Sequence, residues 1–84
     1  MELNLQSLRH EIDRLDNGLL QMLQKRLEVA RLVIKFKKEL HQDINVPARE
    51  QAILDSLKGR ERSLLTAEFI EEIYSRIFTE SKRL

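Results

Sequence analysis

Residues 8–40 of the chain, LRHEIDRLDNGLLQMLQKRLEVARLVIKFKKEL, decide its fold. The apolar side chains recur in alternating steps of four and three residues, which predicts a helix that buries one seam. Gly18 lies off this seam and weakens the helix without ending it, so we expect one helix from about Leu3 to His41. The seam residues are Leu8, Ile12, Leu15, Leu19, Met22, Val29, Val33, Phe36 and Leu40.

The remaining residues predict two shorter helices. Pro47 suits the first turn of a second helix that runs to about Lys58, and Gly59 is a good stop after it. After a linker over residues 60–65, Thr66 is a plausible N-cap for a third helix. The expected fold class is therefore all-α, with three helices in a single domain over residues 1–84.

The composition argues against several classes of protein. Lys and Arg number 15 against 14 Asp and Glu, and the net charge of +1 gives no general reason to expect nucleic acid or an anionic membrane as a partner. The sequence has no cysteine, which excludes disulfides and thiolate metal sites. No apolar run approaches the roughly 18 residues of a membrane span, and the N-terminus lacks the pattern of a signal peptide. We therefore expect a cytoplasmic protein.

The length of the first helix predicts an oligomer. A helix of about 38 residues is roughly 57 Å long. A compact globule of this chain length has a diameter of only about 30 Å, so two short helices cannot cover the seam. The seam must then pack against a second copy or another protein, and an intertwined antiparallel homodimer with two-fold symmetry is the simplest solution.

Two cations stand out on this helix. Arg26 occupies a seam position that the spacing reserves for an apolar residue, and Lys37 points within about 20° of the same direction. Buried cations need anionic partners, which are either glutamates of the protein or a dianionic ligand. Arg9 lies about 25 Å along the axis from Arg26, too far to share a small ligand easily. In an antiparallel dimer, however, Arg9 can reach the site of the other chain.

At these positions the chain resembles the all-helical chorismate mutase family over nearly its whole length. Residues 8–16, LRHEIDRLD, resemble the opening "LRxxIDxxD" signature of the family, and residues 23–30, LQKRLEVA, resemble its "LLxxRxxxA" segment. Residues 35–37, KFK, match the region of the active-site lysine, and residues 46–50, VPARE, resemble the "xxxRE" start of the second helix. Each piece is weak alone, but their order and spacing are specific.

The resemblance implies an isomerase of the shikimate pathway, which supplies Phe and Tyr biosynthesis. The family converts chorismate to prephenate by a concerted rearrangement that uses no nucleophile, metal or cofactor. Such chemistry needs a dicarboxylate held in a compact, chair-like arrangement and positive charge at the breaking ether bond. By resemblance, Arg26 and Arg9 of the partner subunit would clamp the carboxylates, and Lys37 would bond the ether oxygen and a carboxylate.

The resemblance also assigns roles to residues of the other two helices. Arg49 would orient the lysine or its neighbours from the wall of the site, and Glu50 would accept a hydrogen bond from the substrate hydroxyl. Ser81 would touch a carboxylate. The expected catalytic residues are Lys37, Arg26 and Glu50.

Three departures from the family pattern are expected to matter. The family has a glycine where this chain has Ile34, and some members have an aspartate where it has Val46. The family also carries Gln or Glu one helical turn after the serine, at what would be position 85, whereas the printed sequence ends at Leu84. On that ground we expect a weakened enzyme or a domain cut from a longer, bifunctional chain.

Alternative interpretations remain open at the level of sequence. An isochorismate pyruvate lyase uses a similar set of cations on the same fold. A non-catalytic helical dimerisation or regulatory module would need the long helix but not its cations. Arg26 could form a structural ion pair, Arg9 could be an ordinary surface residue, and Glu50 could merely stabilise a helix N-terminus.

Overall fold

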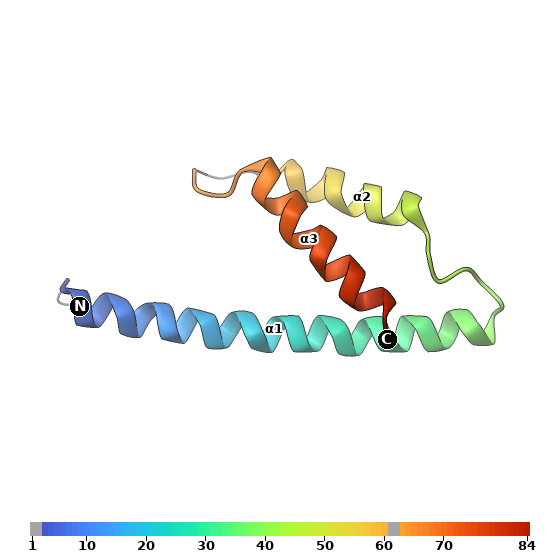
Figure 1. Cartoon of the computed structure of the whole chain (residues 1–84), viewed down its shortest axis with the longest axis horizontal. Coiled ribbons are helices and arrows are strands. Elements are labelled where there is room, and N and C mark those ends of the chain that lie inside the picture. Colours follow the sequence, from blue (N-terminus) through green and yellow to red (C-terminus); the bar gives the residue numbers. More distant parts are fainter. Residues whose placement is uncertain (1–2, 61–62) are drawn as a thin grey trace.

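One long helix runs along the longest dimension of the molecule, and two shorter helices lie on one side of it (Figure 1). The computed structural model describes residues 3–60 and 63–84. Helix α1 spans Leu5–Glu39, α2 spans Pro47–Lys58 and α3 spans Ala67–Lys82, and no strand occurs in the two described ranges. Three helices in an all-α arrangement are as predicted. The predicted bounds of α2 are confirmed, whereas α1 is shorter than predicted at both ends.

The capping residues explain where α1 begins and ends. The Asn4 side chain accepts a hydrogen bond from the Ser7 amide at 2.8 Å, and the Ser7 hydroxyl accepts one from the Asn4 amide at 3.1 Å. This reciprocal capping starts the helix at Leu5. At the other end, His41 is left-handed with φ of 55°, which turns the chain out of the helix.

Helices α2 and α3 form a hairpin on one side of α1 (Figure 1). Pro47 occupies the first turn of α2. The Thr66 hydroxyl accepts a hydrogen bond from the Phe69 amide at 3.2 Å, which confirms the predicted N-cap of α3. Lys58 and Glu71 join α2 to α3 through an ion pair of 2.6 Å, and this hydrogen bond raises the pKa of Lys58.

The seam of α1 is exposed in the single chain. Leu15 retains 52% of its accessible surface and Phe36 retains 59%, and the other seam residues are similarly open. The N-terminal half of α1 lies apart from α2 and α3, and α3 approaches α1 only near its own C-terminus (Figure 1). The radius of gyration is 16.5 Å, well above the roughly 12 Å of a compact chain of this length. Within the part of the chain that the structure describes, a long apolar stripe is therefore left without an intramolecular partner.

The side of α1 that packs within the chain is a different one. Ile34 on α1 is buried together with Ile70 and Phe78 on α3, and these three form the apolar core of the described residues. Neighbouring Val33 belongs to the exposed seam. Arg26 and Lys37 are half-buried, because they lie between the internal face and the seam. No helix in the described ranges is both long and apolar enough to cross a membrane.

Candidate functional site

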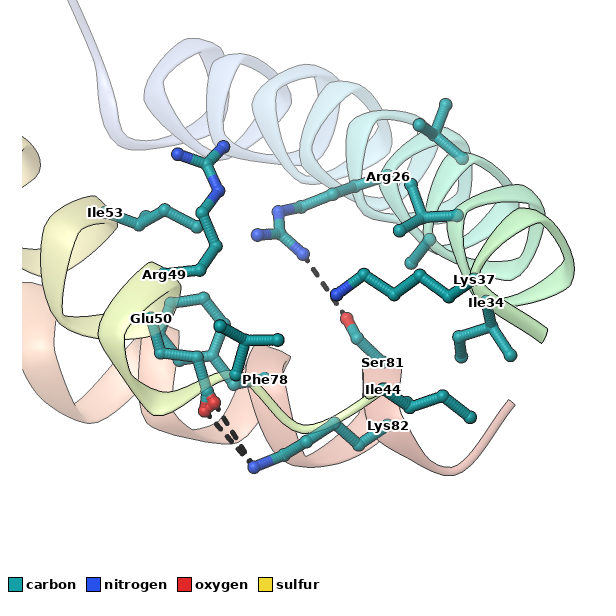
Figure 2. Close-up of a pocket in the computed structure, with 14 residues that line it drawn as sticks. Arg26, Ile34, Lys37, Ile44, Arg49, Glu50, Ile53, Phe78, Ser81 and Lys82 are labelled. Carbon is teal, nitrogen blue, oxygen red and sulfur yellow. Dashed lines mark hydrogen bonds and ion pairs between the residues drawn. The ribbon is translucent and has the colours of Figure 1, made fainter. Parts of the chain in front are cut away.

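A cavity of about 350 Å³ lies where the C-terminal half of α1 faces the start of α2 and the end of α3 (Figure 2). Its volume is within the range of small-molecule sites, about 300–1,000 Å³. The apolar part of its wall comes from all three helices and the α1–α2 connection. Five of the six predicted site residues line it, namely Arg26, Lys37, Arg49, Glu50 and Ser81.

The helical repeat of α1 brings Arg26 and Lys37 to the cavity together. Three turns of helix separate the two residues, so both side chains leave α1 in nearly the same direction. Figure 2 shows both extending from α1 into the space between the helices, with Arg49 opposite them on α2. The sequence prediction that Arg26 and Lys37 face one side is confirmed by their shared cavity.

The end of α1 is fixed beside the lysine of the site. The Lys37 carbonyl accepts a hydrogen bond of 2.8 Å from the Gln42 amide, and the Lys38 carbonyl accepts one of 3.3 Å from the His41 amide. These two bonds form a Schellman motif. The motif redirects the chain immediately after Lys37, and the following connection contributes Ile44 and Val46 to the cavity wall.

Glu50 is held by a residue that the sequence analysis missed. Lys82 on α3 lies 3.2 Å from both carboxylate oxygens of Glu50, and its ammonium also donates to the side-chain oxygen of Asn45 at 3.3 Å. Figure 2 shows the carboxylate turned towards Lys82. The two residues are 32 positions apart, and the only available signal was that Lys82 follows Ser81.

Most of the positive charge in the cavity has no carboxylate partner. Four cations, including Lys82, and one carboxylate line the cavity, a formal net charge of +3. Within residues 3–60 and 63–84, the carboxylate pairs with Lys82, and no carboxylate forms an ion pair with Arg26, Lys37 or Arg49. The cavity is therefore suited in charge to a small molecule with two carboxylates.

Arg9 is the predicted site residue that this chain does not bring to the cavity. It is exposed on the first turns of α1, about 25 Å along the helix axis from Arg26. A contribution from Arg9 to the cavity would require a second chain, which stays a prediction.

Two departures from the family pattern lie in the cavity wall. Ile34 and Val46 both line the cavity and add apolar surface to it. The Val46 carbonyl accepts hydrogen bonds from the amides of Arg49 and Glu50, at 3.0 and 3.3 Å. The Val46 carbonyl is therefore engaged in starting α2.

An all-helical domain with a cation-lined cavity between three helices defines the class of protein. The chain belongs to the chorismate mutase type II family, whose sequence model matches residues 8–84. It is 38% identical to the T-protein of Haemophilus influenzae over 78 residues, which is 92% of the chain and 21% of the relative. It is 35% identical to the T-protein of Enterobacter agglomerans over 82 residues, 96% of the chain and 22% of the relative.

The name of a third relative includes chorismate mutase as one of two activities. The chain is 30% identical over 76 residues to the bifunctional chorismate mutase/prephenate dehydratase of Aquifex aeolicus, covering 90% of the chain and 21% of that protein. The chain thus spans about a fifth of the length of these relatives. No solved structure gives a significant match.

Proposed function

We propose that this domain is a chorismate mutase, which rearranges chorismate to prephenate within the pathway to the aromatic amino acids. The observation that carries the proposal is a small cavity where Arg26, Lys37 and Arg49 converge without a carboxylate partner from the described chain. A substrate with two carboxylates would supply the missing anions. Family membership over residues 8–84 supports the same reaction.

The rearrangement needs positioning and electrostatics rather than a reactive side chain. Arg26 would hold one carboxylate, and Ser81, which accepts a hydrogen bond from Arg26 at 3.3 Å, would touch the same carboxylate by turning its hydroxyl away from the Ile77 carbonyl. Lys37 would donate to the ether oxygen as that oxygen gains electron density in the transition state. A cation fixed in an apolar cavity stabilises such charge strongly, because little solvent has to reorganise.

Arg49 and Glu50 complete the proposed site from the first turn of α2. Arg49 would orient Lys37 and the bound carboxylates from the opposite wall. Glu50 would accept a hydrogen bond from the substrate hydroxyl while Lys82 holds its carboxylate. In this assignment the substrate-binding residues are Arg9, Arg26, Lys37, Arg49, Glu50 and Ser81.

The proposal includes an intertwined antiparallel homodimer. The exposed seam of α1 supports it, because apolar stripes of this length are rarely left open in a stable protein. A two-fold axis would place the N-terminal half of one α1 against the C-terminal half of the other. Arg9 of the partner subunit would then approach the cavity and bind the second carboxylate.

Incubation of the chain with chorismate tests the proposed reaction. Disappearance of chorismate with formation of prephenate is the expected result, and sedimentation should give the mass of a dimer. Release of pyruvate from isochorismate without prephenate formation would instead assign the lyase reaction. A monomer that leaves chorismate unchanged would overturn both the reaction and the dimer.

A further inference from the structure

Three residues on one face of α3 contact the guanidinium of Arg26. Tyr74, Phe78 and Ser81 follow each other at intervals of four and three residues, so they lie on the same side of that helix. The guanidinium carbon of Arg26 is 5.8 Å from the centroid of the Tyr74 ring and 5.7 Å from that of Phe78. Both distances are within the range, about 6 Å, at which a cation is attracted to an aromatic ring.

The groups that hold Arg26 are themselves fixed. The two rings meet edge to face, with centroids 6.0 Å apart and planes at 63°, and Phe78 is only 8% exposed. The Ser81 hydroxyl donates to the Ile77 carbonyl at 2.8 Å, which leaves its oxygen to accept from Arg26 at 3.3 Å. Arg26 is therefore supported by two rings and a hydroxyl of α3.

This kind of support leaves the charge of Arg26 available. A carboxylate would also orient the guanidinium, but it would compete with an anionic substrate for the same N–H groups. Aromatic rings attract the cation without neutralising it. They also restrict the long side chain before a ligand arrives, so binding has less rotamer freedom to remove.

We propose that Tyr74 and Phe78 are positioning residues that hold Arg26 ready for a substrate carboxylate. The expected effect on catalysis rests on the proposed function, whereas the contact between Arg26 and the two rings can be tested without substrate. Tyr74 is better suited to substitution than Phe78, because it is half-buried and lies outside the apolar core.

The spectroscopic test uses the single tyrosine of the chain, which has no tryptophan. Tyrosine fluorescence therefore reports on Tyr74 alone. Arg26→Leu should change its intensity while far-ultraviolet circular dichroism stays the same. Lys37→Leu, a matched loss of a cation on the same side of α1, should leave the tyrosine signal unchanged. Identical spectra for wild type and Arg26→Leu would overturn the contact.

The kinetic test compares Tyr74→Leu with Tyr74→Phe. Removing the ring should lower kcat/KM for chorismate by about tenfold, mainly through a higher KM, whereas Tyr74→Phe keeps the ring and should stay within about twofold. Partial unfolding would lower kcat in proportion to the inactive fraction and leave KM unchanged. An unchanged KM in Tyr74→Leu would therefore contradict the positioning role.

The two tests separate the positioning role from the reaction. If wild type does not convert chorismate, the proposed function fails, and the fluorescence comparison still decides whether Tyr74 contacts Arg26. If wild type is active and both substitutions of Tyr74 cost the same, the hydroxyl rather than the ring matters and the proposal is wrong. A changed spectrum in Arg26→Leu together with a raised KM in Tyr74→Leu alone is the result we expect.

Discussion

Arg26 interrupts the apolar seam of α1 at a position where leucine would fit the three-four spacing. A purely structural helix gains nothing from such an interruption, because a half-buried cation loses solvation. The Arg26 guanidinium contacts α3 through Ser81, Tyr74 and Phe78, none of which carries a negative charge. We therefore interpret Arg26 as a residue retained for an anionic ligand.

Replacing Arg26 by leucine separates a catalytic from a structural role. Arg26→Leu should lower kcat/KM for chorismate by about 10²–10³-fold, the loss that removal of one preorganised hydrogen-bond donor causes in other enzymes. The free energy of unfolding should stay the same or rise, because the seam becomes continuous. Urea unfolding and a chorismate assay on one preparation give both values. Lys25→Leu, on the exposed face beside it, is the control and should keep its activity.

Among residues 3–60 and 63–84, His41 is the residue other than glycine with a positive φ. Its φ of 55° is the left-handed conformation that glycine adopts without cost. His41→Gly should therefore stabilise the protein by roughly 0.5–1 kcal/mol, after the entropy of glycine is subtracted. Thermal unfolding should show a higher Tm for His41→Gly and a lower Tm for Gln42→Gly. Equal effects of the two glycines would show that the backbone of His41 is unstrained.

Single residues were predictable from the sequence when helical geometry alone placed them. Arg26 and Lys37 could be assigned to one side because both lie on α1. Lys82 and Tyr74 could not be found in this way, because their contacts with Glu50 and Arg26 depend on how α3 crosses the other helices.

Helix bounds were predictable where a residue type determines them locally. Pro47 and Thr66 start α2 and α3 as predicted. The end of α1 was placed two residues too late, because the left-handed conformation of His41 is unusual for a residue other than glycine. The spacing of apolar residues also missed the internal face at Ile34, because that face and the seam lie side by side on one helix.

If the exposed seam of α1 is the dimer interface, a charge introduced into the seam should disrupt the dimer. Leu15→Asp would place an unpaired carboxylate in the proposed interface, at a cost of several kcal/mol to association. Sedimentation should then show a monomer, and far-ultraviolet circular dichroism should show reduced helix content. Asn17→Asp adds the same charge on the opposite side of α1, beside Gln24, and should leave the dimer intact. A Leu15→Asp protein that sediments like wild type would exclude the seam as the interface.

At the scale of the whole molecule, the length of α1 and the exposure of its seam both favour the proposed dimer. The chain extends over 55 Å in its longest dimension but only 16 Å in its shortest. Its buried core within the described ranges is limited to Ile34, Ile70 and Phe78, which is little for an independently stable domain. A second copy would cover the seam and bring Arg9 to the cavity, so stability and catalysis would depend on the same contact.

Mixing two inactive variants tests this central claim most directly. Arg9→Ala lacks the cation donated to the partner, and Lys37→Ala lacks the lysine of its own cavity, so each homodimer should be nearly inactive. After unfolding and refolding together, half of the dimers should be mixed, and each should contain one intact site. The equimolar mixture should therefore recover about a quarter of the wild-type rate. A rate no higher than the mean of the two variants would contradict a site shared between two chains.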